Sequence, residues 1–388
     1  MIIIDCFLSA AAPIFLITFS LLALALKKMR LQKTRSINFT PECNVFIPCK
    51  GVDDEFEKNI ERFFKLSYPN YNLYFAVESE TDPAASVIRR KIEFYKKGKL
   101  VVSEETKFCG QKNLNLVRAI DVSDEADILV FADGDIAPNE NWLDSLICPL
   151  ENPDITAASG FRWLYSKTND LGSQVHSFQN YVLFVLFAVS AKFFNLGLWG
   201  GSMAIRKKDY DALRVRSRWL ETSVDDSSLA EIMVKNKKKV QFSFDTITDT
   251  SDTIKAYDKA DKWFVRQVQY LKYHSKLSWI FALLLSALTL AFFVRAAVIC
   301  VFYVFEQNLA AFIFPLSFVV GIFIFASMFC LFGVKGKMLS FVLYSPVSLF
   351  NVCLCVVKTA FINVVDWSGY RYFMKFLNGK VWKVEKIL

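Results

Sequence analysis

The residues best suited to chemistry are two carboxylates, Asp133 and Asp135, separated by a single glycine. They follow the apolar run 128–131, ILVF, which has the composition of a strand buried on both faces of a parallel sheet. Open α/β sheets bind ligands beyond the carboxyl ends of their strands. Carboxylate oxygens are hard ligands suited to Mg²⁺ or Mn²⁺. The pattern predicts a metal and phosphate site, although a solvated Asp-Gly turn has the same local sequence.

Short apolar runs alternate with helical stretches through the part of the chain that leads to this cluster. We predict helices over 54–66, 84–97 and 111–121 and strands at 45–47, 73–77, 100–102 and 128–131. Strand–helix alternation at this spacing predicts a doubly wound α/β fold with a mostly parallel sheet.

Polar segments follow each of the earlier predicted strands. Segment 48–53 follows the first strand, 78–84 follows the second, and 110–115 opens the helix after the third. The carboxyl ends of parallel strands meet at one edge of a sheet, so we expect these segments to line one rim together with the acidic cluster. A nucleotide binds at such a rim.

The composition indicates a membrane protein. Of its 388 residues, 54% are hydrophobic and 38 are Phe, and the mean hydropathy is +0.30. Soluble domains are nearer ~45–50% apolar, so we expect part of the chain to lie in lipid. The net charge of +8 fits an anionic membrane surface or a phosphorylated substrate better than a nucleic-acid groove, and no nucleic-acid partner is expected. With only two histidines, a zinc site is not expected either.

Two regions precede residue 277. Residues 1–35 contain an uncharged run at 6–26 followed by basic residues. This pattern predicts a retained transmembrane anchor with the following residues in the cytosol. Residues 36–276 are predicted to form the cytosolic α/β domain. Within it, the apolar segment 181–199 is interrupted by a lysine and an asparagine, and we expect it to lie at the membrane interface rather than to cross.

Residues 277–388 are predicted to form transmembrane and interfacial helices with a basic tail. Spans are expected at 279–305 and 309–332, the second of which is followed by two lysines. Segment 338–365 contains a proline, an asparagine and a lysine, so we expect a re-entrant or surface-lying pair of helices there. The prediction is a multi-pass membrane protein, placed in the inner membrane of a bacterium or in the ER or Golgi of a eukaryote.

In this order and spacing, the motifs resemble the family-2-type (GT-A) glycosyltransferases, most closely the ceramide glucosyltransferase branch and its bacterial relatives. The matching segments are PCKGVDD (48–54), ESETDPA (78–84), KNLNL (112–116), FADGDIAPNENWL (131–143), GGSMAIRKKD (200–209), VDDSSLAE (224–231) and DWSGYRYFMKFLNGKVW (366–382). The resemblance covers nearly the whole chain and implies a GT-A domain with an N-terminal anchor and C-terminal membrane helices.

The resemblance also implies roles in binding a nucleotide sugar. Glu78 and Asp82 would contact the nucleoside, and Pro48 and Lys50 would lie near the base or the phosphates. Lys112 would offset phosphate charge, although a solvated lysine at a helix start has the same appearance in the sequence.

The same resemblance implies roles for two acidic pairs. Asp133 would bind ribose or sugar, and with Asp135 it would hold the Mn²⁺ or Mg²⁺ that bridges the diphosphate and stabilises the leaving group. Asp226 would deprotonate the acceptor hydroxyl, with inversion at the anomeric carbon, and the neighbouring charge of Asp225 would raise the pKa of one member of this pair. A helix N-cap is the alternative role for Asp226, because an aspartate before Ser227 and Ser228 would cap a helix well.

One motif departs from the family. Members usually carry (Q/R)xxRW after the second acidic pair, whereas this chain retains Arg266 but has Gln269 and Tyr270 in place of Arg and Trp. Arg266 could still bind the diphosphate, and Tyr270 could stack on an acceptor. Loss of the second cation leaves diphosphate binding and acceptor identity open.

The leading prediction is an inverting membrane glycosyltransferase. It would transfer a hexose from a UDP-sugar, with UDP-glucose favoured, to the hydroxyl of a ceramide-like membrane lipid. One alternative is a processive polysaccharide synthase, which usually has more membrane helices and an intact QxxRW. The other is an inactive transferase-like scaffold or lipid-binding protein, which the altered motif favours.

Overall fold

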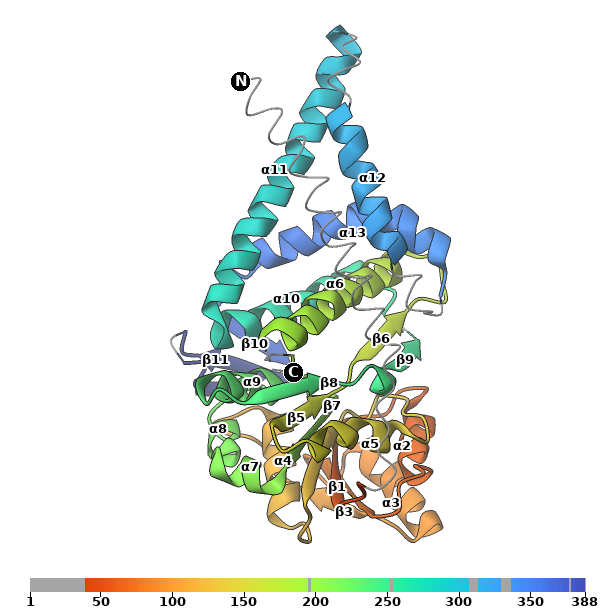
Figure 1. The fold of residues 1–388 in the computed structure, drawn as a ribbon, viewed down its shortest axis with the longest axis vertical. Helices are drawn as coiled ribbons and strands as arrows, with labels where there is room; N and C mark the ends of the chain where they lie inside the picture. Colours follow the sequence, from red (N-terminus) through yellow and green to blue (C-terminus); the bar gives the residue numbers. More distant parts are fainter. Residues whose placement is uncertain are drawn as a thin grey trace.

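The computed structural model describes residues 39–194, 197–251, 254–306, 313–328, 336–376 and 378–387. The predicted anchor at residues 1–35 lies outside them. Figure 1 shows an α/β domain at one end of the molecule, two long helices lying across it, and a group of apolar helices beyond these.

The α/β domain is built on a seven-stranded sheet of order β3-β2-β1-β4-β7-β5-β8. β1 pairs in parallel with β2 and β4, and β2 pairs in parallel with β3. β7 is antiparallel to both of its neighbours, β4 and β5, and this reversal was not predicted. The strands are β1 Cys43–Pro48, β2 Tyr71–Val77, β3 Lys99–Val102, β4 Ile128–Ala132, β5 Ile155–Ser159, β7 Ser202–Arg206 and β8 Lys239–Phe242. The prediction of a mostly parallel sheet is confirmed.

Helices cover both faces of this sheet. Val45 and Ile47 face one apolar core, and Phe46 faces the other. Burial on both faces explains why the central strands read as continuous apolar runs. The first core packs against α2 Phe56–Phe64, α3 Pro83–Tyr95 and α5 Trp142–Ile147, and the second against α4 Gln111–Asp121, α8 Val215–Trp219 and α9 Asp226–Lys235.

Two helices, α6 Leu171–Phe194 and α10 Tyr257–His274, lie between the sheet domain and the apolar helices (Figure 1). Aromatic side chains of α6, among them Phe178, Tyr181 and Phe184, share a core with α10, α12 and α13. α6 begins ten residues before the predicted interfacial segment 181–199. Beside it, β6 Arg162–Tyr165 pairs in parallel with β9 Thr248–Ser251.

Of the described helices, α11 Lys276–Glu306 and α13 Met338–Lys358 are long and apolar enough to cross a membrane, judged by length and composition. α12 Ile313–Ser327 is apolar but shorter. α11 leaves large apolar side chains such as Leu277, Phe281 and Leu284 exposed. Figure 1 shows α11 and α12 extending away from the sheet domain while α13 runs across α6.

The C-terminal region differs from the prediction. α13 is one continuous helix with Pro346 inside it, not a pair of helices. The basic tail then forms a three-stranded antiparallel sheet, β10 Val364–Trp367, β11 Tyr370–Met374 and β12 Val381–Lys386. Ser368 and Gly369 join β10 to β11 with φ values of 52° and 83°, as a two-residue hairpin turn of type I′ requires.

Candidate active site

Three elements bring an acidic cluster together at the rim of the sheet. Asp133 follows β4, Lys112 lies in the first turn of α4, and Asp225 precedes α9. The ammonium Nζ of Lys112 lies 2.8 Å from Asp133 Oδ1 and 3.0 Å from Asp225 Oδ2. Lys112 is therefore held between two carboxylates from distant parts of the chain, and it is not the solvated lysine of the alternative interpretation.

Two glycines allow the backbone before β7 to approach these carboxylates. A Cβ on Gly200 would lie 2.2 Å from Asp225 Oδ2, and a Cβ on Gly201 would lie 2.6 Å from Asp133 Oδ2. Neither distance leaves room for a side chain. The N–H of Gly200 also donates a hydrogen bond of 2.9 Å to Asp226 Oδ2, so the glycine pair fixes both acidic loops.

The cluster gives its members different protonation behaviour. Burial raises the pKa of Asp226 to about 6, and the charge of Asp225 adds to this, against the opposing effect of Lys112. Burial also disfavours the charges of Lys112 and Asp133, but their attraction outweighs it, so the pKa of Lys112 is raised and that of Asp133 is lowered. Asp226 is thus the carboxylate poised to take up a proton near neutral pH.

The second acidic pair lies at the start of α9. Asp225 occupies the N-cap position of α9, but its side chain makes no capping hydrogen bond. Asp226 is the first residue of the helix and accepts hydrogen bonds from the N–H and hydroxyl of the adjacent Ser227 and from the Gly200 N–H. Asp226 therefore binds both the first turn of α9 and the glycine loop at the rim, and the helix-end contact is compatible with a second role at the rim.

Asp135 lies at the outer side of the cluster. Its carboxylate is 51% exposed and forms an ion pair with Arg162 of β6, whose guanidinium lies 5.7 Å from the ring centroid of Trp199. Among the described residues, no group of three or more His, Cys, Asp or Glu side chains is placed to hold a metal ion. Mg²⁺ sites that bind substrate phosphates use one or two carboxylates and complete the shell with phosphate and water. Asp133 and Asp135 are two such carboxylates on one loop, and in this structure they are ion-paired with Lys112 and Arg162.

A cleft of about 520 Å³ opens beyond β1 and β2, and Lys50, Glu78, Ser79, Thr81, Asp82, Glu105 and Lys386 line it. Lys50 Nζ donates to Glu78 Oε2 at 2.9 Å. Asp82 caps α3 by accepting from the Ala84 N–H, and it also accepts from the Gly51 N–H at 2.8 Å. Three of the residues expected to bind the nucleotide therefore share one cleft, and Pro48 ends the adjoining strand β1.

The C-terminal sheet borders this cleft. The sequence predicted neither this sheet nor its contact with the cleft. The Tyr370 hydroxyl donates to Glu78 Oε1 at 2.6 Å, and Lys50 Nζ donates to the Ser368 carbonyl at 2.7 Å. Burial of Glu78 would raise its pKa, but these bonds from Tyr370 and Lys50 outweigh it and the pKa is lowered. Glu78 therefore carries a negative charge that the protein's own groups already bind.

The residues of the altered motif on α10 point to different places. Gln269 Nε2 donates to the Val364 carbonyl at 2.6 Å, so this side chain anchors β10. Arg266 lies 5.6 Å from the ring centroid of Trp367, and its charge helps to lower the pKa of Asp133. Tyr270 is 6% exposed, and its hydroxyl has no hydrogen-bond partner among the described residues.

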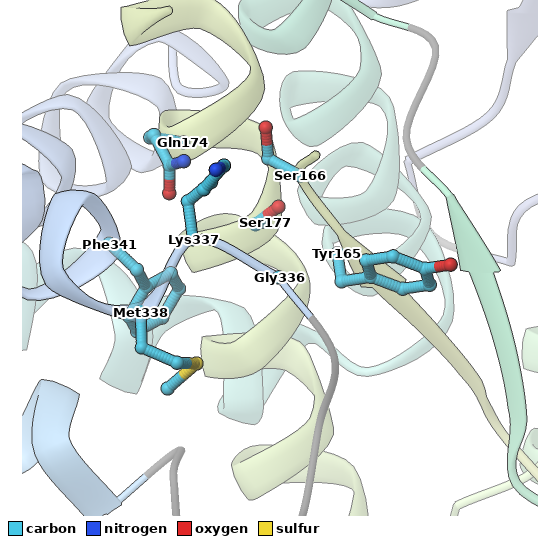
Figure 2. Close-up of a pocket in the computed structure, with 8 residues that line it drawn as sticks. All are labelled: Tyr165, Ser166, Gln174, Ser177, Gly336, Lys337, Met338 and Phe341. Carbon is cyan, nitrogen blue, oxygen red and sulfur yellow. The ribbon is translucent and has the colours of Figure 1, made fainter. Parts of the chain in front are cut away.

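A second crevice lies away from the acidic cluster. Figure 2 shows it between the end of β6, α6 and the start of α13, lined by Tyr165, Ser166, Gln174, Ser177, Gly336, Lys337, Met338 and Phe341. Its volume of about 10 Å³ is close to that of a single water position. It is too small to hold a nucleotide or a lipid chain.

The fold and the rim define a GT-A-like glycosyltransferase. The chain belongs to glycosyl transferase family 21, whose model matches residues 10–376. This confirms the resemblance stated from the motifs.

The solved structures similar to the chain include two enzymes with bound nucleotide sugars. A mannosyltransferase from Pyrobaculum calidifontis, in complex with GDP-Man and Mn²⁺, is 17% identical with a TM-score of 0.52, and the match covers 91% of this chain and 98% of that one. Glucosyl-3-phosphoglycerate synthase from Mycobacterium tuberculosis, in complex with Mn²⁺, UDP-glucose and glycerol 3-phosphate, is 13% identical with a TM-score of 0.40 over 60% of this chain and 79% of that one. The first match supports the GT-A-like fold.

Proposed function

We propose that this family 21 glycosyltransferase transfers a hexose from a UDP-sugar, with UDP-glucose favoured, to the hydroxyl group of a ceramide-like membrane lipid, with inversion. The observation that carries the proposal is Asp226. It is a carboxylate with a pKa raised to about 6, and it adjoins the cluster of Lys112, Asp133 and Asp225. A base of this kind is suited to removing a proton from an alcohol during its attack.

The donor would lie along the rim of the sheet. Its nucleoside would occupy the cleft that Lys50 and Asp82 line, and its diphosphate would lie near Asp133, Asp135 and Arg266. A divalent cation, Mn²⁺ or Mg²⁺, held by Asp133 and Asp135 would supply positive charge to the leaving diphosphate. Arg266 would add a second positive charge, since it already acts electrostatically on Asp133.

The reaction is a single displacement. The oxygen of the lipid hydroxyl forms a bond to the anomeric carbon, while the bond from that carbon to the diphosphate oxygen breaks and UDP leaves with its electron pair. The hydroxyl proton passes to Asp226. Attack from the side opposite the leaving group inverts the anomeric configuration. Lys112 keeps Asp133 and Asp225 in place through the ion pairs described above.

The position of the apolar helices favours a lipid acceptor. α10 carries Arg266 and Tyr270 and packs against α6 and α13. α11 continues directly from α10 and presents an apolar surface. A lipid in a bilayer around these helices would have its headgroup near the rim and its chains in the hydrocarbon. We propose that α11 and α13 cross or enter the membrane, with the sheet domain in the cytosol.

The test uses membranes from cells that express the full chain, radiolabelled UDP-glucose, Mn²⁺ and ceramide. We expect one labelled glycolipid, and we expect Asp226→Asn to lower its rate of formation by at least ~100-fold. Asp211→Asn is the matched control, since Asp211 is an exposed carboxylate on α7 Lys207–Ala212.

Three results would refute the proposal. They are a labelled water-soluble polymer, which a processive synthase would make; the absence of any labelled product, as for an inactive scaffold; and a glycolipid whose formation does not depend on Asp226.

A further inference from the structure

The hairpin turn of the C-terminal sheet lies on the loop that follows β1. Lys50 Nζ donates to the Ser368 carbonyl at 2.7 Å, and a Cβ on Gly369 would lie 3.8 Å from the same nitrogen. Lys50 therefore joins two segments 318 positions apart in sequence, and one of them is the turn of the C-terminal sheet.

Two residues opposite each other in this sheet contact residues that line the cleft. Tyr370 pairs with Lys386 across β11 and β12. The Tyr370 hydroxyl binds Glu78 at 2.6 Å. Lys386 forms an ion pair with Glu105, and its Nζ also lies 3.8 Å from Glu78 Oε1. Lys386 is thus a positive charge that the C-terminal sheet adds to the lining of the cleft.

The strand order indicates which part of a bound nucleotide would lie near the Lys386 ammonium group. Glu105 follows β3, Glu78 follows β2, and the Asp133–Asp135 loop follows β4, in the order β3-β2-β1-β4. Neighbouring strands are about 4.8 Å apart, so β2 lies about 10 Å from β4. A donor with its diphosphate at the acidic loop would extend its nucleoside towards β2 and β3, where Lys386 lies.

We propose that the C-terminal sheet is part of the donor site, in which Lys386 donates a hydrogen bond to the nucleoside and Tyr370, through Glu78, positions Lys50. This inference rests on the proposed function in one respect, namely that the donor is a nucleoside diphosphate sugar. A uracil carbonyl or a ribose hydroxyl is an acceptor that an ammonium group binds. The Lys386 side chain is 61% exposed, and exposed ion pairs such as that with Glu105 contribute little, so the ammonium exchanges this partner for a ligand at small cost.

The test measures equilibrium binding of UDP and of uridine, each with Mn²⁺, to the purified full chain in detergent. We expect Lys386→Ala to weaken the binding of both compounds about tenfold, which corresponds to about 1.4 kcal/mol. Lys383→Ala is the matched control. It removes the same charge from the same strand, but Lys383 pairs with Glu385 and lies over the Phe373 ring, so we expect a change of less than about twofold.

Two further, more conservative variants keep the test valid if Lys386→Ala fails to fold. We expect Lys386→Arg to bind UDP within about threefold of the wild-type chain, because the charge is retained. We expect Tyr370→Phe, which removes only the hydroxyl that binds Glu78, to weaken UDP binding about threefold. Unchanged binding in Lys386→Ala would overturn the inference, and so would weaker binding of UDP with unchanged binding of uridine, because that result places Lys386 at the phosphates. A wild-type chain that binds neither compound would refute the proposed function itself.

Discussion

Replacement of Asp226 by asparagine is expected to stabilise the fold while it abolishes transfer. Burial and the charge of Asp225 raise the pKa of Asp226 from 3.8 to about 6. The folded chain then binds this proton more tightly than the unfolded chain, so stability falls as the pH rises from about 4 to about 6. Above that range, the ionised carboxylate costs the fold about 3 kcal/mol, since each pKa unit is worth about 1.36 kcal/mol.

Asparagine removes this cost because it is neutral at every pH. It also loses one hydrogen bond, because Asp226 accepts from Gly200 with one oxygen and from Ser227 with the other, and the amide has a single acceptor oxygen. The lost bond costs about 1 kcal/mol. The expected net gain is about 2 kcal/mol at pH 8, and it shrinks to near zero at pH 4.5 because the folded wild-type chain then holds its proton.

Thermal unfolding of the detergent-solubilised chain at these two pH values measures the effect. A gain of this size raises the Tm by a few degrees. Asp211→Asn serves as the control, because the exposed pair of Asp211 with Lys207 is worth less than about 1 kcal/mol. A Tm of Asp226→Asn equal to that of the wild type at pH 8, or the same gain at both pH values, would refute the raised pKa.

Three further predictions concern the same cluster. The kcat/KM of the wild-type chain should rise with pH through about 6 and fall about tenfold per pH unit below it, because the base must be ionised; a flat profile between pH 5 and 7 would exclude Asp226 as the base. Gly200→Ala should lower transfer at least tenfold, because its Cβ would lie 2.2 Å from Asp225 Oδ2; activity close to wild type would show that the loop moves freely. Tyr270→Phe should raise the stability of the substrate-free chain by about 1 kcal/mol, because it removes a buried hydroxyl without a partner; a loss of stability in a denaturation curve would show that the hydroxyl has a partner.

The first half of the sheet could be predicted because its strands are buried on both faces. β1, β2 and β4 have almost no polar residues to obscure their pattern, and α4 falls on the predicted residues 111–121. The polar segments after these strands then follow from the topology, because parallel strands end at one edge.

The C-terminal sheet could not be predicted in the same way. Its strands are only partly buried and are rich in lysine and aromatic residues, so the region resembled a basic tail. The alternating burial of Tyr370, Tyr372 and Met374 is visible only in the structure, because Arg371 is the single charged residue of YRYFM and the segment carries only a weak period-two pattern. Its contacts with the cleft could not be read from any local pattern, because the bond from Tyr370 to Glu78 joins residues 292 positions apart.

The altered motif on α10 shows the same limit. The sequence indicates that Gln269 replaces an arginine, but only the structure shows that its side chain binds β10. The hydroxyl of Tyr270 likewise appears as an unpartnered group only when the surrounding residues are placed.

The most direct test of the account is the structure of the product made from UDP-glucose and ceramide. Proton NMR of the purified glycolipid determines both the number of sugars attached and the anomeric configuration. Direct displacement assisted by Asp226 predicts a single β-linked glucose on the lipid hydroxyl. An α-linked product would contradict the single displacement, and a chain of several sugars would contradict transfer to a lipid acceptor alone.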